Sequence, residues 1–339
     1  MNMTIREQIE AMEKETLSPY ACFSVNSKGR DREEAQCDIR PVFQRDRDRI
    51  LHSKSFRRLK NKTQVFLTPK GDHYRTRLSH TLEVSQNART IAKALRLNED
   101  LVEAIALGHD LGHTPFGHAG EFILNKIYEG GFKHNEQSVR IVEKLEKDGE
   151  GLNLTWEVRD GILNHQTSTM PHTLEGKIVR FSDKIAYVNS DIDDAIRAQL
   201  LCEEDIPFEL RKTLGFNSKS RLNHLIHDII IHSRNQNDII MSPETSEALK
   251  ELRVFMFENV YKNPVAKGEE VKAKAMLEQM YYFYMDHVEM LPQKHLRMME
   301  KGEDQGRVVC DYIAGMTDQY AITKFSEHFM PEAWQVDGY

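Results

Sequence analysis

The chain has 339 residues, of which 40% are hydrophobic and 29% are charged, and this length allows one large core or two modest ones. Its net charge of −7 argues against general nucleic-acid binding, which needs a basic surface, but allows a locally basic pocket for a phosphorylated metabolite. The four cysteines, Cys22, Cys37, Cys202 and Cys310, lie far apart, so neither a disulfide framework nor a cysteine zinc site is expected.

The N-terminal segment is charged and lacks the apolar centre of a signal peptide, and no apolar run is long enough to span a membrane. We therefore expect a soluble, cytoplasmic protein. Thr4 and Glu7 have the spacing of a capping box and predict a helix from Thr4 to about Glu15. An irregular arm is expected over residues 18–40.

A basic stretch, Arg45–Arg58, follows this arm. It has two interpretations: a solvated helix whose arginines pair with Asp46 and Asp48, or an anion-binding face. The next segment, Lys62–Leu67, is rich in β-branched and aromatic residues and predicts a short strand or an extended turn.

The region that follows contains a cluster of histidines. Helical periodicity over Leu78–Leu95 places His80 near the start of one helix, and Asn98 is a suitable N-cap for a second helix that runs towards His109. His109 and Asp110 are adjacent, so both can reach one ion only near a helix end or bend. The sequence supplies residues that favour such a bend: Gly108, Gly112, Pro115 and Gly117. A divalent metal site is one hypothesis, and ordinary core or surface histidines are the alternative.

A long amphipathic helix is predicted over Leu174–Leu200. Its apolar stripe consists of Leu174, Ile178, Phe181, Ile185, Val188, Ile192 and Ile196. The opposite face carries Asp183, Lys184, Tyr187 and Asp191. This face is either solvated or the lining of a pocket for a phosphate and a sugar.

The remaining chain also reads as helical. Helices are predicted over Phe122–Tyr128, Ser138–Leu145 and Thr155–Leu163, and long amphipathic helices over Leu222–Ile231 and Ala273–Met290, with breaks at Pro207, Pro243, Pro264 and Pro292. The fold class is therefore expected to be all-α.

The order H…HD…D, formed by His80, His109, Asp110 and Asp183 on three predicted helices, resembles that of the HD-domain metal phosphohydrolases. The similarity is greater to one branch, the deoxynucleoside-triphosphate triphosphohydrolases, or dGTPase-like family. The shared motifs are Gln64, RLSH (Arg77–His80), HDLGHTPFGH (His109–His118), HNEQS (His134–Ser138), Asp183-Lys184 with Tyr187 and Asp191, and DYIAGMTDQYA (Asp311–Ala321). The resemblance as a whole covers roughly residues 40–321. Glu121 is a departure, because mammalian relatives carry aspartate there.

This resemblance implies an HD-domain helical fold with a helical C-terminal extension. We expect an N-terminal helix and basic arm over residues 1–52 and a metal-dependent phosphohydrolase core over residues 53–200. Residues 201–339 are expected to form a helical region that packs on this core as one structural unit.

The resemblance also implies a reaction in which water attacks the α-phosphorus of a deoxynucleoside triphosphate, releasing deoxynucleoside and intact triphosphate. His80, His109, Asp110 and Asp183 would hold one divalent ion, which activates water and polarises the phosphoryl group. Mg²⁺ or Mn²⁺ is expected, and Fe, Ni or Zn is compatible with these ligands.

The same resemblance assigns roles to the other motif residues. His118 would donate a proton to the leaving 5′-oxygen, and Glu121 and His134 would orient it. The expected phosphate contacts are Arg77, His113, Lys184 and Tyr187. Gln64 and Asp191 would bind the 3′-hydroxyl of the sugar.

Two alternatives remain open: another HD-domain phosphohydrolase or phosphodiesterase, or a catalytically weak nucleotide-sensing regulator. Because relatives form tetramers or hexamers, a homo-oligomer is expected. Arg45–Arg58 is a candidate site for a regulatory nucleotide at a subunit interface, whereas nucleic acid and membrane are not expected partners. The motifs leave the preferred base undecided.

Overall fold

The protein is helical throughout the computed structural model, which describes residues 3–64 and 74–331, without the side chains of residues 264–267. Within these ranges there are sixteen α-helices and no strand, and an isolated antiparallel bridge joins Thr63 to Thr76. The all-α prediction is confirmed. The predicted strand or turn at Lys62–Leu67 is described only as far as Gln64, because residues 65–67 lie outside the described ranges.

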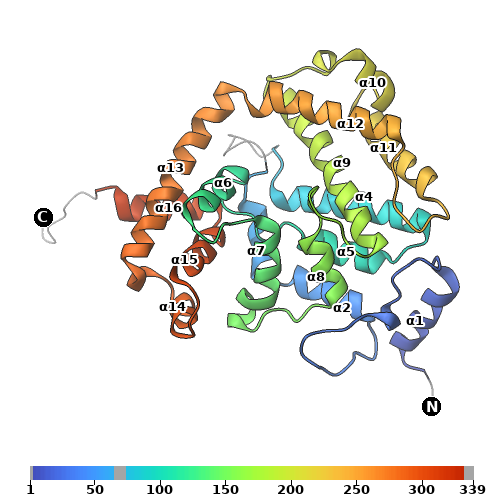
Figure 1. The fold of residues 1–339 in the computed structure, drawn as a ribbon, viewed down its shortest axis with the longest axis horizontal. Coiled ribbons are helices and arrows are strands. Elements are labelled where there is room, and N and C mark those ends of the chain that lie inside the picture. The colour runs from blue at the N-terminus through green and yellow to red at the C-terminus, as the bar shows by residue number, and fades with distance from the viewer. Residues whose placement is uncertain (1–2, 65–73, 332–339) are drawn as a thin grey trace, which may run out of the picture.

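The first and last helices, α1 and α16, lie at opposite ends of the long axis of the molecule (Figure 1). Their bounds are α1 (Ile5–Thr16), α2 (Val42–Leu51), α3 (Lys54–Arg58), α4 (Arg77–Leu95), α5 (Glu99–Gly108), α6 (His118–Ile127), α7 (His134–Arg140), α8 (Trp156–Leu163), α9 (Leu174–Arg197), α10 (Phe208–Leu214), α11 (Ser218–Ser233), α12 (Pro243–Met256), α13 (Pro264–Asp286), α14 (Gln293–Glu300), α15 (Gln305–Ala314) and α16 (Asp318–Phe329). None of the described helices is long and apolar enough to cross a membrane.

Local sequence signals set several of these helix ends. Thr4 and Glu7 form the predicted capping box at the start of α1. Asn98 caps α5 by accepting a hydrogen bond from the backbone N–H of Leu101 at 3.2 Å. Helix α5 then ends at Gly108, and His109 occupies its C-cap position. The histidine–aspartate pair therefore lies at a helix end, as predicted.

The predicted breaks at Pro243 and Pro264 are confirmed, because the preceding helical segments end at Ser233 and Tyr261. These prolines are the first residues of α12 and α13, since proline is tolerated in the first turn, where its missing N–H costs nothing. Helix α13 consequently begins before the predicted Ala273. The predicted helix over Ser138–Leu145 is also different: α7 already begins at His134 and passes into a π-helical turn at Ile141–Leu145.

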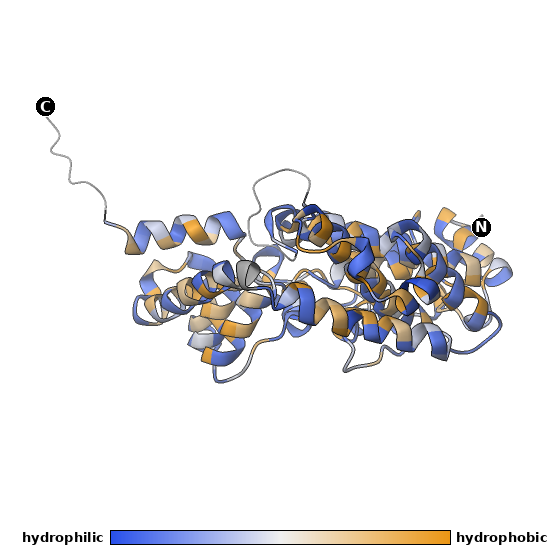
Figure 2. Cartoon of the chain, turned by 90° about the horizontal axis from the view of Figure 1, so that it is seen from above, coloured by the Kyte–Doolittle hydropathy of each residue, from blue (hydrophilic) through white to orange (hydrophobic). Residues whose placement is uncertain are grey.

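Apolar side chains gather in two clusters, and polar and apolar residues alternate along the helices (Figure 2). The first cluster packs α2, α4, α5, α8 and α9 together with α10, α11 and α12. The second contains α6, α13, α15 and α16, of which α13 packs against each of the other three. The apolar stripe of α9 is buried in the first cluster through Ile178, Ile185 and Ile192.

The basic stretch at α2 is mostly neutralised by carboxylates. Asp46, however, does not pair with an arginine of its own helix: it is buried and accepts hydrogen bonds from Arg30 and Thr155. Asp48 does pair with Arg47, as the solvated-helix interpretation predicts. That interpretation is therefore wrong for Asp46, because a buried carboxylate needs partners within the core.

Candidate active site

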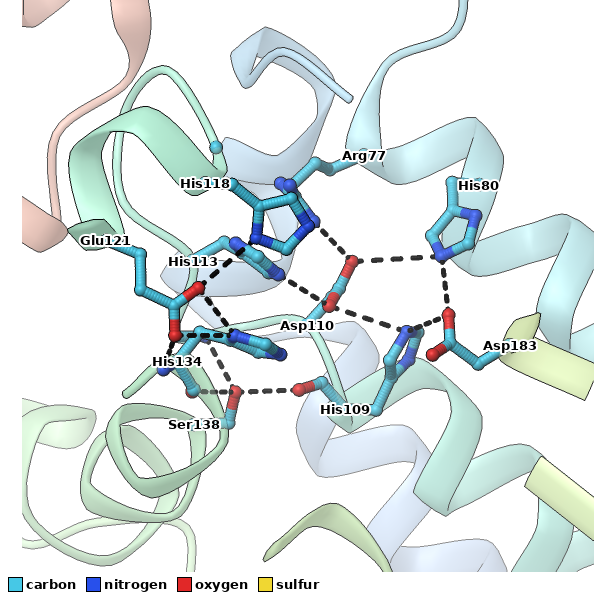
Figure 3. Close-up of polar contacts among 12 residues, drawn as sticks. Arg77, His80, His109, Asp110, His113, His118, Glu121, His134, Ser138 and Asp183 are labelled. Atoms are coloured by element: carbon cyan, nitrogen blue, oxygen red, sulfur yellow. Dashed lines mark hydrogen bonds and ion pairs between the residues drawn. The ribbon is translucent and has the colours of Figure 1, made fainter. Parts of the chain in front are cut away.

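Four of the predicted side chains converge from three helices (Figure 3). His80 comes from α4, His109 and Asp110 from the end of α5, and Asp183 from α9. His80 Nε2 lies 3.1 Å from Asp183 Oδ1, and His109 Nε2 lies 3.8 Å from the same oxygen. His109 Nε2 is also 3.5 Å from Asp110 Oδ1. His80, His109 and Asp110 each offer a ligand atom, and all three atoms lie within 4.8 Å of one another.

The turn after α5 lets both His109 and Asp110 point into this cluster. Ser138 Oγ on α7 accepts a hydrogen bond from the backbone N–H of Gly112 at 2.8 Å and lies 2.8 Å from the carbonyl oxygen of His109. Gly112 is required here, because a Cβ at this position would lie 2.2 Å from the carbonyl oxygen of His134. Helix α7 therefore packs directly on the turn and fixes its backbone.

The protonation of His109 indicates that this cluster fits a cation. His109 Nδ1 lies 2.7 Å from the carbonyl oxygen of Ala106, which can only accept, so Nδ1 carries the proton and Nε2 a lone pair. That buried Nε2 has no hydrogen-bond partner and faces oxygens of Asp110 and Asp183. A divalent ion would satisfy these electron-rich atoms, and the mixed nitrogen and oxygen set does not distinguish among Mg²⁺, Mn²⁺, Fe, Ni and Zn.

The charges of the site favour anionic carboxylates in spite of burial. Burial raises the pKa of Asp110, but His109, His113 and Arg77 outweigh it and hold that pKa well below its usual range. For Asp183, burial is likewise outweighed by His80 and His109, which lower its pKa to about 2. Both carboxylates therefore remain charged and available as ligands at neutral pH.

A second set of side chains lies between this cluster of four residues and α6. His118 Nδ1 lies 3.3 Å from Glu121 Oε2, and the ring nitrogen Nδ1 of His134 lies 2.9 Å from Glu121 Oε1. The other nitrogen of His134 lies 3.2 Å from His165 Nε2, which is free to accept because His165 Nδ1 donates to the carbonyl oxygen of Ile162. The geometry thus provides an acceptor for each N–H of His134. His118, by contrast, is exposed.

A pocket of about 710 Å³ opens beside both sets. Lys184 lines it, and among the described residues it forms no ion pair. Burial, followed by Arg180 and Arg253, lowers its pKa to about 8. Gln64 Oε1 and Asp191 Oδ1 also belong to residues lining the pocket, and both atoms are buried without a hydrogen-bond partner among the described residues.

The structure brings all the predicted site residues to this pocket or to its floor. Arg77 is engaged rather than free: its Nη1 donates to Asp110 Oδ2 at 2.8 Å, and its side chain is buried. His113 also contacts Asp110, at 3.2 Å, and its ring stacks on that of His134 with centroids 3.9 Å apart. Tyr187 lines the pocket next to Arg253, whose guanidinium lies 5.6 Å from its ring.

The pocket residues that sequence reasoning missed include His165, Arg253 and Tyr261. The position of His165 offered one signal, because it follows a predicted helix in the same way as His109 does. Tyr261, whose hydroxyl donates to Asp191 Oδ2, comes from a π-helical turn seventy positions further along the chain. No local pattern links it or Arg253 to the motif residues.

Comparison with known proteins gives a consistent result. The chain matches the HD domain over residues 77–188 and the phosphohydrolase-associated domain over residues 239–327. A protein from Caldanaerobacter subterraneus named deoxyguanosinetriphosphate triphosphohydrolase-like protein is 58% identical, over 98% of both chains. One of the same name from Desulfatibacillum aliphaticivorans is 48% identical, over 97% of this chain and 99% of its own. A solved phosphohydrolase from Bacteroides thetaiotaomicron has a similar fold, with a TM-score of 0.50 and 17% identity over 83% of this chain and 68% of that chain.

Proposed function

Because the chain belongs to the deoxyguanosinetriphosphate triphosphohydrolase-like family of HD-domain phosphohydrolases, we propose that it converts a deoxynucleoside triphosphate to deoxynucleoside and inorganic triphosphate. The substrate would be dGTP or several dNTPs. One observation carries the proposal: His80, His109, Asp110 and Asp183 converge at a pocket. Cationic side chains and unpaired polar atoms also line this pocket.

We propose that those four residues hold one divalent ion, with Mg²⁺ or Mn²⁺ expected. The lone pair of His109 Nε2 and the charged carboxylates of Asp110 and Asp183 support this assignment. When bound, the ion supplies Lewis-acid activation of water and of the phosphoryl group.

The triphosphate would be bound by side chains on the adjoining wall of the pocket. Lys184 has no competing ion pair among the described residues and can serve as a point charge for a phosphate. Arg77 uses one nitrogen on Asp110 and keeps other donors, including a buried Nε with no partner. His113 and Tyr187 complete the proposed phosphate contacts.

The sugar would be bound at the other wall. Gln64 Oε1 and Asp191 Oδ1 are acceptors without donors, so a 3′-hydroxyl would satisfy atoms that are otherwise buried and unpaired. Tyr261 donates to the second oxygen of Asp191 and orients its carboxyl group.

His118 is proposed as the proton donor to the 5′-oxygen that leaves. Its exposed ring can reach a substrate in the open pocket, and its Nδ1 points at Glu121. His134 binds the same carboxylate and would keep Glu121 in place. Removing such a general acid costs on the order of 10²–10⁴ in rate.

The products test this proposal. Purified protein with Mn²⁺ or Mg²⁺ would be incubated with each of the four dNTPs and with GTP, and the products separated by anion-exchange chromatography and identified by ³¹P NMR. The expected products are a deoxynucleoside and tripolyphosphate in equal amounts. Orthophosphate, pyrophosphate or a nucleoside monophosphate as the first product would contradict the proposed reaction, and binding without turnover would favour a sensing role.

A further inference from the structure

A second cavity of about 340 Å³ lies behind the candidate active site and shares no lining residue with the active-site pocket. It is enclosed by α3, the π-helical turn Ile141–Leu145, the start of α14, and the turn that joins α15 to α16. None of the motif residues with a proposed catalytic role lines it.

Three basic side chains line this cavity: Arg58, Lys294 and His295. Arg58 donates one hydrogen bond, to Ser55 Oγ at 3.0 Å. Lys294 has no hydrogen bond or ion pair among the described residues. His295 is only 3% exposed, and its buried Nδ1 has no partner.

The acidic groups nearby are already occupied. Asp311 lines the cavity, but its oxygens accept hydrogen bonds from Gln137 and Arg140 at 2.8–3.0 Å. Glu146 lies close to Arg58, yet its carboxylate accepts from the backbone and hydroxyl of Ser55 at 2.7 and 2.6 Å. Because the Ser55 donors are neutral, Glu146 keeps its charge and offsets part of that of Arg58 and Lys294, but neither cation forms an ion pair among the described residues.

Burial lowers the pKa of all three basic groups of the cavity. Burial, followed by the positive charges of Lys294 and Arg58, lowers the pKa of His295 to about 3. Burial also lowers the pKa of Arg58, and Glu146 compensates only in part. An anion placed among these groups would relieve both effects.

We propose that this cavity binds a small anion that carries a phosphate group. An arginine fork and a lysine point charge are the residue types that recognise phosphate, and the imidazole of His295 adds a further polar contact. The volume admits a phosphate group with a small organic body, which would lie against the apolar side chains of Ile141, Leu145 and Met316. The inference does not depend on the proposed reaction.

The position of the cavity links it to the active-site turn. Ala314, next to the lining residue Gly315, accepts a hydrogen bond at 2.9 Å from Lys62 Nζ, which also donates to the carbonyl oxygen of His113. At the start of α16, the carboxylate of Asp318 accepts a hydrogen bond from the backbone N–H of Phe116 at 2.9 Å. A bound anion would thus lie one layer of residues behind the turn that carries His113.

Calorimetric titration of metal-free protein with inorganic phosphate, and separately with dGMP as a phosphate monoester, tests the proposal. Lys294→Gln and Arg58→Gln are expected to weaken one component of binding at least about tenfold, the effect of removing a charge-assisted contact. Arg57→Gln and Arg297→Gln are the matched controls, because they make the same charge change on α3 and α14 at residues that do not line the cavity. The active-site pocket is the same in all five proteins.

Loss of phosphate binding in the test variants but not in the controls would assign the site to inorganic phosphate. The same pattern for dGMP alone would assign it to a phosphate ester. If Lys294→Gln and Arg58→Gln bind both ligands as wild type does, the proposal is overturned. Should Arg58→Gln fail to fold, Lys294→Gln decides the matter, since that side chain has no partner to lose.

Discussion

The proposed proton donor, His118, is a different residue from the proposed metal ligands. His118 is 80% exposed and pairs with Glu121, whereas His80, His109 and Asp110 are buried in the adjoining cluster. A change at His118 should therefore leave the metal-type ligands intact.

We expect His118→Ala to keep its divalent ion and to lose dNTP hydrolysis by a factor on the order of 10²–10⁴, because the leaving oxygen would have no proton donor. Steady-state kinetics and metal analysis of the same preparation measure both quantities. His232→Ala is a suitable control, since His232 is a partly exposed histidine paired with an aspartate on α11, outside the pocket. Equal rates for His118→Ala and the control would remove His118 from the mechanism.

The carboxyl group of Asp191 makes stability depend on pH. Burial raises its pKa to about 7 from an ordinary value of 3.8, although Tyr261 donates a hydrogen bond to it. Between these two values the native carboxyl keeps a proton that the unfolded chain has released. The contribution of Asp191 to the free energy of unfolding therefore falls as pH rises through this window and is constant above it.

Asp191→Asn cannot titrate, so the difference in unfolding free energy between wild type and this variant should shift by a few kcal/mol, on the order expected for such a pKa change, from pH 4 to pH 7. As pH rises, the free energy of unfolding of wild type should fall relative to that of Asp191→Asn. Urea unfolding of the metal-free proteins at several pH values measures it. Curves that run parallel across the window would show that the carboxyl group is not held neutral.

The four residues proposed as metal ligands could be picked out from the sequence because each belongs to a short local motif. His109 and Asp110 are adjacent, and glycine and proline mark the turn that aims them. His165 and Tyr261 could not be predicted in this way. Their roles depend on a ring-to-ring contact with His134 and a hydrogen bond to Asp191, both of which form only when distant segments pack.

At the level of the helices, the contact between α7 and the turn after α5 holds the backbone that positions His109 and Asp110. A Cβ on Gly112 would lie 2.2 Å from the carbonyl oxygen of His134 and 2.3 Å from the backbone nitrogen of Ser138. Backbone atoms cannot move aside as a flexible side chain can, so the helix and the turn would have to separate.

Gly112→Ala is therefore expected to destabilise the protein by about 1–3 kcal/mol and to lower metal affinity. Gly268→Ala supplies the control, because Gly268 lies in helix α13 with open space at its Cβ, and alanine favours a helix over glycine. Thermal unfolding and metal titration of the two variants make the comparison. An unchanged Gly112→Ala protein would mean that α7 does not fix the turn.

Helix positions could be predicted from periodicity and caps, but not every boundary. The chain does break before Pro243 and Pro264, but α13 begins at Pro264 and not at the predicted Ala273. The early start of α7 at His134 was missed because its first turn is polar in sequence. Those polar residues are buried there with distant partners: Ser138 bonds to the turn after α5, Asn135 to the carbonyl oxygen of Leu163 and Gln137 to Asp311. Tertiary contacts therefore set this helix start, which no local sequence signal marks.

In the whole molecule, the candidate site lies where the two hydrophobic clusters meet. His80, His109 and Asp183 stand on helices of the first cluster, while His118 and Glu121 stand on α6, which belongs to the second. The domain bounds predicted at residues 52 and 200 stay a prediction, as do the homo-oligomer and the regulatory nucleotide. The sequence could not indicate this meeting of clusters, because α6 packs on α13 across more than a hundred residues of chain.

Metal analysis of wild type, His109→Ala and His165→Ala tests whether the four converging residues hold a divalent ion. We expect one ion per chain in wild type and in His165→Ala, because His165 is a buried neighbour of His109 outside the proposed ligand set. His109→Ala is expected to retain its helical circular dichroism but to bind no ion and to hydrolyse no dNTP. A folded His109→Ala protein that keeps its ion, or hydrolyses dNTPs at nearly the wild-type rate, would show that this metal site is wrongly assigned.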